Sequence, residues 1–116
     1  MGINEVQIIN EELLGLSKAE YCASPFKEKI LRASLKSSVE KYIDRQRVVI
    51  LDSMNYIKGF RYELYCLARN AQTTLCCVWC DTKVEIAQKI CYEAEYENQF
   101  PKELFEDYAG RLEHPN

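Results

Sequence analysis

With 116 residues, 47% hydrophobic and 28% charged, the chain has the size and composition of one globular domain, residues 1–116. This balance excludes a disordered or low-complexity segment. No apolar run approaches the roughly 20 residues of a membrane helix, so we expect no membrane partner. Because the first residues form no secretory signal, the six cysteines are expected to be reduced thiols in a cytosolic or nuclear protein.

The net charge of −3 divides unevenly along the chain. Residues 1–26 carry one base and four acids, residues 27–69 ten bases and five acids, and residues 70–116 four bases and nine acids. The middle part, with an excess of five positive charges, could bind the phosphates of a nucleotide or of RNA. The alternative is a helix with a solvated face of lysine and arginine, which is common on protein surfaces.

The first predicted elements are a strand and a helix. Apolar residues over 6–9 predict a short buried strand that ends before the acids of Asn10-Glu11-Glu12. Residues 13–23 have no clean period and are expected to form a loop with a short helical turn. Ser24 and Pro25 are typical of a helix start, and the apolar residues that follow repeat with the helical period for about five turns.

Residues 48–52 predict a second strand, in which four large apolar residues precede Asp52. Such a continuous apolar run is typical of a parallel strand covered on both faces. A loop over 53–59 and a helix over 60–71 follow, and then another short apolar strand over 73–80. Further helices are expected over 84–92 and from Pro101 to Leu112.

The alternation of strands and helices predicts an α/β domain with a parallel sheet. Ligands of such sheets bind beyond the carboxyl ends of the strands. An acid stands at each of the three predicted ends: Glu11, Asp52 and Asp81. These acids indicate a ligand site, although each one could instead be a helix cap or a loop residue.

The segment from Asp52 to Arg61 carries the residues best suited to chemistry. A carboxylate at a strand end, such as Asp52, can hold the water shell of Mg²⁺, and Ser53 adds a hydroxyl beside it. Lys58 and Arg61 flank Gly59 at a helix start, where free N–H groups and the helix dipole favour an anion. The alternative is a capping acid, a loop glycine and surface bases.

The string LDSMNYIKGFRYELYCLAR, residues 51–69, closely resembles the signature block of the KTI (killer toxin insensitivity) or chromatin-associated family of Elongator-regulating P-loop ATPases. This family is related to the seryl-tRNA(Sec) kinases. INEELLG at residues 9–15, the basic helix around Arg32 and RLEHPN at residues 111–116 are also similar to the family. The resemblance covers nearly the whole chain and implies a P-loop kinase-like, three-layer α/β/α fold with a parallel sheet.

The resemblance further implies an ATP-binding, tRNA-stimulated ATPase that associates with Elongator and supports modification of wobble uridines in tRNA. ATP and Mg²⁺ are the implied cofactors. Asp52 matches the Walker B-type acid that acts through Mg²⁺, with Ser53 beside it, and Glu11 falls where relatives usually carry the catalytic-type aspartate after the second strand. The resemblance thus implies catalytic roles for Asp52, Ser53 and Glu11. The loop over 53–59 matches the segment that senses the γ-phosphate, which gives nucleotide- or phosphate-binding roles to Asn55, Lys58 and Gly59. Arg61, at the helix start that follows, is the fourth expected phosphate-binding residue.

The 116 residues contain no G-x-x-x-x-G-K-[ST] loop, although phosphoryl chemistry in this superfamily uses one. By the resemblance, we expect that loop and the first strand upstream of Met1, so that the fold is incomplete here. The strands at 48–52 and 74–80 would then pair directly or present apolar edges. We also expect the chain alone to bind ATP weakly or not at all. The implied lid segment, 83–100, holds two lysines and no arginine.

Two other functions stay open: a non-catalytic fragment that binds tRNA or Elongator through its basic middle, and a seryl-tRNA kinase-like phosphotransferase. The C-x-x-C of Cys77 and Cys80 is interpreted as buried strand cysteines, because residues three apart on a strand point to opposite faces and a closed zinc site needs four ligands. The eight tyrosines, including Tyr56, Tyr62 and Tyr65, could stack on RNA bases, but their helical spacing is also typical of packing residues.

Overall fold

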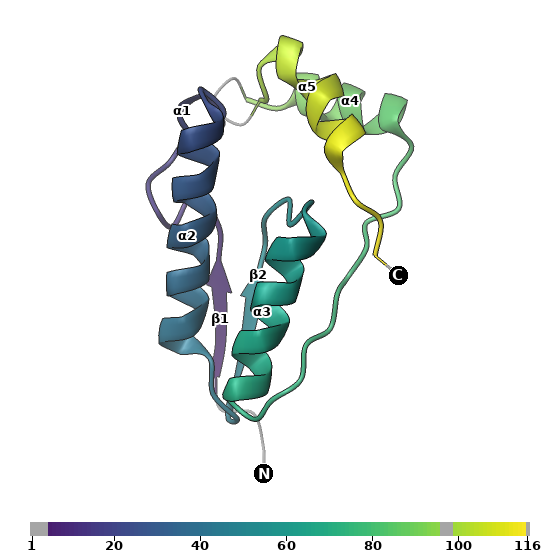
Figure 1. Ribbon diagram of the computed structural model, residues 1–116. Helices are drawn as coiled ribbons and strands as arrows, with labels where there is room; N and C mark the ends of the chain where they lie inside the picture. The colour runs from purple at the N-terminus through teal and green to yellow at the C-terminus, as the bar shows by residue number, and fades with distance from the viewer. Residues whose placement is uncertain (1–4, 96–98, 116) are drawn as a thin grey trace.

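The computed structural model describes residues 5–95 and 99–115, and in these ranges a two-stranded parallel sheet forms the centre of the fold. Strands β1 (Glu5–Ile9) and β2 (Arg47–Leu51) pair residue by residue over their full length (Figure 1). The predicted α/β architecture with a parallel sheet is therefore confirmed. Predictions that fall on residues 1–4, 96–98 and 116 lie outside the described ranges.

Helices α1 (Lys18–Tyr21) and α2 (Pro25–Tyr42) connect the two strands, as the sequence predicts. The Oγ of Ser24 accepts the backbone N–H of Lys27 at 3.2 Å, and proline occupies the first helical position, where a missing N–H costs nothing. Helix α3 (Lys58–Asn70) follows β2 and begins two residues earlier than predicted.

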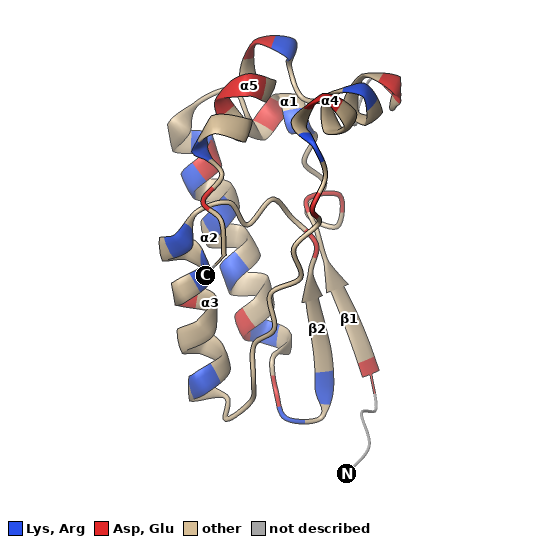
Figure 2. Cartoon of the chain, turned by 90° about the vertical axis from the view of Figure 1, so that its right-hand side faces the viewer, with Lys and Arg blue, Asp and Glu red and all other residues tan. Residues whose placement is uncertain are grey.

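Helices α2 and α3 cover one face of the sheet and build the core with it (Figures 1 and 2). Ile9 and Leu35 are the most deeply buried large side chains, at 0% and 1% exposure. The apolar residues of α2 repeat at helical spacing and meet those of α3 over the strands; the buried set includes Leu31, Leu35, Val39, Phe60 and Leu64.

The opposite face of the sheet has no helix on it in the part of the chain that the structure describes. Val6 and Ile8 of β1 and Ile50 of β2 point to this face and are 61%, 52% and 45% exposed. The prediction that β2 is covered on both faces is not met here, because α4 (Val84–Glu93) and α5 (Lys102–Arg111) lie beyond the carboxyl ends of the strands instead (Figure 2).

The predicted strand over 73–80 is wrong for this structure. The segment runs from α3 toward α4 without regular secondary structure and does not pair with β2 (Figure 1). Apolar, strand-forming residues do not make a strand by themselves, because the backbone N–H and C=O groups need a neighbouring strand. Cys76, Cys77 and Cys80 are consequently exposed, against the prediction of buried strand cysteines.

No helix in the described ranges is long and apolar enough to cross a membrane.

Replacing Ser24 by alanine is expected to lower the free energy of unfolding by about 1 kcal/mol, because the first turn of α2 loses its side-chain cap. Urea unfolding followed by circular dichroism measures this change. Ser37→Ala, an exposed position in the same helix, is the matched control and should change stability much less. Equal effects of the two substitutions would show that the cap contributes nothing specific.

Candidate functional site

The carboxyl ends of β1 and β2 bring Glu11, Asp52 and Ser53 together. The backbone N–H of Asp52 donates to the carbonyl of Ile9 at 2.9 Å, which extends the strand pairing by one residue. The Ser53 hydroxyl donates a short hydrogen bond to Oε1 of Glu11. Acidic residues therefore lie just beyond the ends of both strands (Figure 2), and the side chains of Glu11 and Ser53 are in direct contact there.

A tight turn after β1 holds Glu11 in this place. The Asn10 side-chain oxygen accepts the N–H of Leu13 at 2.8 Å, and the Glu11 carbonyl accepts the N–H of Leu14 at 3.1 Å. Gly15 closes the turn with a φ of +71°, a backbone conformation that favours glycine. The turn thus fixes the backbone of Glu11, so that its side chain reaches across to the end of β2.

The loop between β2 and α3 carries Asn55 in an unusual conformation. Its φ is +46°, a left-handed value that asparagine tolerates better than most residues. Its Nδ2 donates to the carbonyl of Leu51 at 3.1 Å, which ties the loop back to the end of β2. Its Oδ1 is buried and has no hydrogen-bond partner within the described residues. A buried acceptor without a partner is costly and marks a place where a ligand or a water can donate.

The start of α3 already holds a carboxylate. The backbone N–H of Lys58 donates to Oε2 of Glu113 at 2.6 Å, as expected for an anion at a helix N-terminus. The Arg61 guanidinium donates to the backbone carbonyls of Asn55 and Glu113, both at 2.7 Å. A Cβ atom at Gly59 would lie 4.0 Å from Cγ2 of Ile57, which is an ordinary van der Waals contact. Anion binding at this helix start is therefore seen for a carboxylate of the chain itself.

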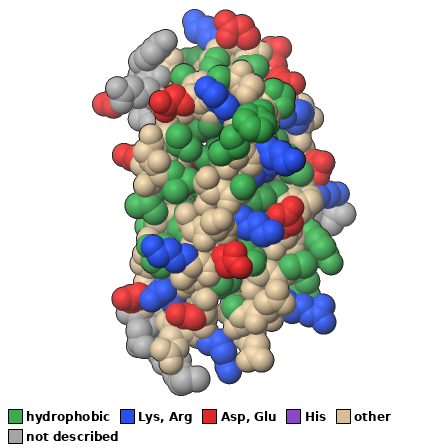
Figure 3. Space-filling view, turned by 60° about the vertical axis from the view of Figure 1, so that its left-hand side comes forward, with side chains coloured by type: hydrophobic (Ala, Val, Ile, Leu, Met, Phe, Trp, Pro, Cys, Tyr) green, Lys and Arg blue, Asp and Glu red, His purple; other side chains and the backbone are tan. Residues whose placement is uncertain are grey.

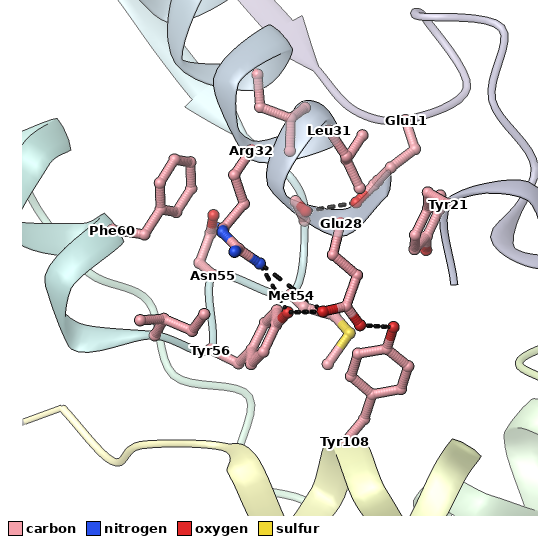
Figure 4. A pocket seen from close by; sticks show the side chains of 13 residues that line it. Glu11, Tyr21, Glu28, Leu31, Arg32, Met54, Asn55, Tyr56, Phe60 and Tyr108 are labelled. Atoms are coloured by element: carbon pink, nitrogen blue, oxygen red, sulfur yellow. Dashed lines mark hydrogen bonds and ion pairs between the residues drawn. The ribbon is translucent and has the colours of Figure 1, made fainter. Parts of the chain in front are cut away.

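A narrow pocket joins the strand ends to the helical part of the molecule. Its lining includes Glu11, Ser53, Asn55, Glu28 and Tyr56 (Figure 4). Its interior of about 20 Å³ has room for about one water molecule. The other predicted site residues do not line this pocket; they are Asp52, Lys58, Gly59 and Arg61.

Glu28, a carboxylate that is only 7% exposed, is not among the site residues predicted from the sequence. It accepts hydrogen bonds from Tyr108 and Arg111 of α5 and from Tyr56 of the loop. Burial alone would raise the pKa of Glu28, but the hydrogen bonds from Arg111 and Tyr108 outweigh it and lower this pKa. A signal was present in the sequence: Glu28 precedes Leu31 on the apolar stripe of α2, where a charge is out of place.

The free energy of unfolding should fall at acid pH because of Glu28. A group whose pKa is lower in the folded state stabilises the fold fully above its ordinary value of 4.5 and progressively less as the pH falls through the lowered value. Urea unfolding measured from pH 6 down to about pH 3 tests this. Glu28→Gln should flatten the pH dependence without abolishing it, because the pKa of Glu20 is also lowered, by hydrogen bonds from Ser17. An unchanged pH profile in Glu28→Gln would contradict the assignment.

Asp81 does not join the site. It is exposed on the irregular segment before α4 and does not follow a strand, so the predicted third acid at the sheet edge is wrong. Within the described ranges, no group of three or more histidine, cysteine, aspartate or glutamate side chains is arranged to hold a metal ion. In the implied lid segment, Lys89 forms an exposed ion pair with Glu93 at 3.8 Å.

Comparisons with known proteins agree on one family. The sequence profile described as "Chromatin associated protein KTI12" matches residues 3–116. A Xenopus laevis protein named "Protein KTI12 homolog" is 38% identical over 112 residues, which are 97% of this chain and 41% of that protein. A Rattus norvegicus protein of the same name is 70% identical over 53 residues, 46% of this chain and 15% of that protein.

A solved structure has the same fold. The crystal structure of Chaetomium thermophilum Kti12 in complex with ADP-AlF3 matches with a TM-score of 0.84 and 33% sequence identity, over 97% of this chain and 65% of that one. The chain thus spans about two fifths of the length of the Xenopus relative and two thirds of the solved chain.

Proposed function

Because the chain belongs to the KTI12 family of chromatin associated proteins, we propose that it forms the acidic side of a Mg²⁺–ATP site in a regulatory ATPase. One observation carries this proposal. Glu11, Asp52 and Ser53 meet at the carboxyl ends of two parallel strands, in a fold that matches a relative solved with ADP-AlF3. Nucleotides bind at this edge in open α/β sheets.

The donor set fits a hydrated Mg²⁺ ion. Mg²⁺ prefers one or two carboxylates together with water and phosphate oxygens, so Asp52 and Glu11 would hold it through water, with the Ser53 hydroxyl beside them. When bound, the ion would neutralise charge on the phosphates. The partnerless Oδ1 of Asn55 would accept a hydrogen bond from a water or a ligand hydroxyl.

On the α3 side, Lys58 and Arg61 would bind phosphate oxygens. In this structure, the Glu113 carboxylate accepts the backbone N–H of Lys58, and the Glu113 backbone carbonyl accepts Nη2 of Arg61. A phosphate would therefore compete with the Glu113 carboxylate for the N–H of Lys58. The 116 residues contain no G-x-x-x-x-G-K-[ST] motif, and the pocket accepts little more than one water. The chain thus supplies the metal and sensor side of the proposed site and not the phosphate loop.

We further propose Elongator and tRNA as partners, with a role in the modification of wobble uridines, in the cytoplasm or the nucleus. Lysines and arginines of α2 and α3 support contact with RNA, as do the exposed rings of Tyr62 and Tyr65, which stack at 6.2 Å between centroids. Basic and acidic side chains are interspersed on the side that Figure 3 shows, so charge alone does not define a continuous RNA-binding patch there.

A second candidate is a non-catalytic module that binds tRNA through this surface. The lack of a G-x-x-x-x-G-K-[ST] motif in the 116 residues favours it for the chain by itself. Filter binding of tRNA at several salt concentrations tests it. If the module binds RNA by stacking, Tyr62→Ala combined with Tyr65→Ala should weaken binding about tenfold or more, because base–aromatic stacking contributes about 1–3 kcal/mol per base. Glu40→Ala, an exposed change on α2, is the control.

Isothermal titration calorimetry with Mg-ADP tests the nucleotide proposal. It compares the 116-residue chain with a chimaera, defined as the Chaetomium thermophilum Kti12 in which these residues replace the segment that they match. The chimaera should bind with micromolar affinity, and the chain alone weakly or not at all. Micromolar binding by the chain alone would overturn our expectation for the isolated chain. A folded chimaera that binds no Mg-ADP would overturn the proposed site.

A further inference from the structure

The buried carboxylate of Glu28 joins three segments that are far apart in sequence (Figure 4). From α5, the Tyr108 hydroxyl and Nη2 of Arg111 donate to its Oε1, the latter at 3.0 Å. From the loop after β2, the Tyr56 hydroxyl donates to its Oε2 at 3.3 Å. Glu28 itself lies in the first turns of α2. One carboxylate thus connects α2, α5 and the loop.

Tyr56 links Glu28 to the pocket, because it lines the pocket and donates a hydrogen bond to Glu28. Its hydroxyl also accepts a hydrogen bond from Nη1 of Arg32 at 3.0 Å, so it is held from two sides. Tyr56 is 7% exposed and follows Asn55 directly in the chain. The position of the Tyr56 ring therefore restrains the loop from Ser53 to Ile57, which carries two of the polar residues that line the pocket.

The cluster of Glu28, Tyr56, Tyr108 and Arg111 also holds α5 in place. The Tyr108 ring meets the Tyr56 ring edge-on at 5.7 Å between centroids. The Arg111 guanidinium lies over both rings, 4.7 Å from Tyr108 and 5.5 Å from Tyr56. If α5 moved away, Glu28 would lose the donors Tyr108 and Arg111 in a place with little water, and the donor that remains, Tyr56, would have to rearrange around it.

We propose that Glu28 is a positioning residue that couples the seating of α5 to the conformation of the 53–57 loop, and thereby to ligand binding in the pocket. Such coupling is reciprocal: a nucleotide that orders the loop would also hold α5 in place. The link to nucleotide rests on the proposed function, whereas the link between α5 and the loop rests on the contacts of Glu28 alone.

Hydrogen exchange of single amides in the 116-residue chain tests the coupling without nucleotide. Tyr108→Phe removes one donor from the α5 side and keeps the ring. The decisive amide is that of Asp52, which bonds to Ile9 at the start of the loop and does not line the pocket. Its exchange should accelerate about threefold to tenfold, the population change expected from one lost hydrogen bond. Tyr65→Phe, on the exposed face of α3, is the matched control and should leave it unchanged.

Faster exchange confined to α5 would overturn the proposal, because Tyr108 would then only hold its own helix. Should Tyr108→Phe fail to fold, Arg111→Lys, which keeps the charge and loses the two-point contact with Glu28, provides the same comparison.

A double-mutant cycle on Mg-ADP affinity of the chimaera tests the nucleotide link. If the loop transmits the effect, the Mg-ADP affinity of the double variant Tyr108→Phe, Asn55→Ala should differ by about twofold or more from the value expected by combining the two single effects. Effects that simply combine would overturn the link. Absence of Mg-ADP binding by the folded unsubstituted chimaera would refute the proposed function instead, and the exchange experiment would still decide the coupling.

Discussion

Replacing Glu28 by alanine is expected to lower the free energy of unfolding by about 2 kcal/mol. The substitution leaves the hydroxyls of Tyr56 and Tyr108 buried without their acceptor and removes the ion pair with Arg111 at 3.0 Å. The cost should stay below the 3–5 kcal/mol typical of a broken buried pair, because the Arg111 side chain is 41% exposed and can turn to water. Urea unfolding gives the value directly.

Glu40→Ala is the matched control for this prediction, because Glu40 is exposed on the same helix. It should change stability by less than about 0.5 kcal/mol, as is usual for surface substitutions. If Glu28→Ala changed the free energy of unfolding as little as this control, the cluster around Glu28 would contribute little to stability. The proposal that it holds α5 in place would then be contradicted.

Replacing Asp52 by alanine in the chimaera is expected to reduce ATP turnover by about a hundredfold or more, without unfolding the protein. Asp52 is exposed at the end of β2, and its backbone N–H, which the substitution keeps, makes the bond to Ile9. The loss should therefore come from the missing carboxylate at the metal and not from the fold. Steady-state ATPase assays with tRNA present, together with a thermal melt, measure both effects.

Asp81→Ala is the matched control for Asp52→Ala, because Asp81 is an exposed aspartate outside the site. It should leave ATP turnover within about twofold of the unsubstituted chimaera, as expected for a surface change. Undiminished hydrolysis in Asp52→Ala would count against the metal role of Asp52.

Much of the fold could be predicted because its signals are local. Ser24 and Pro25 mark the start of α2, and the apolar run before Asp52 marks β2. The segment over 73–80 has equally strong strand propensity but no partner strand in the described part of the chain, so it stays irregular. Strand pairing depends on residues that are far away in sequence, and the strand propensity of a segment carries no information about them.

The candidate site could be predicted in part for the same reason. The order of strands and helices brings Glu11 and Ser53 to one edge of the sheet, and they meet there through a hydrogen bond. The seating of Glu113 on the start of α3 joins residues 55 positions apart, and the contact between Glu28 and Tyr108 joins residues 80 positions apart. No local sequence pattern predicts either contact. The position of Glu28 on the apolar face of α2 is nevertheless unusual for a charged residue and is visible in the sequence.

In the proposed nucleotide site, the ends of β1 and β2, with the loop that follows, form the metal and sensor side. NMR of the backbone amide signals of this segment, recorded while Mg-ADP is added to the chimaera, tests this directly. The largest shift changes should fall within residues 10–12 and 52–61. Binding with changes confined to other regions, such as residues 73–95, and none at the strand ends would contradict the claim.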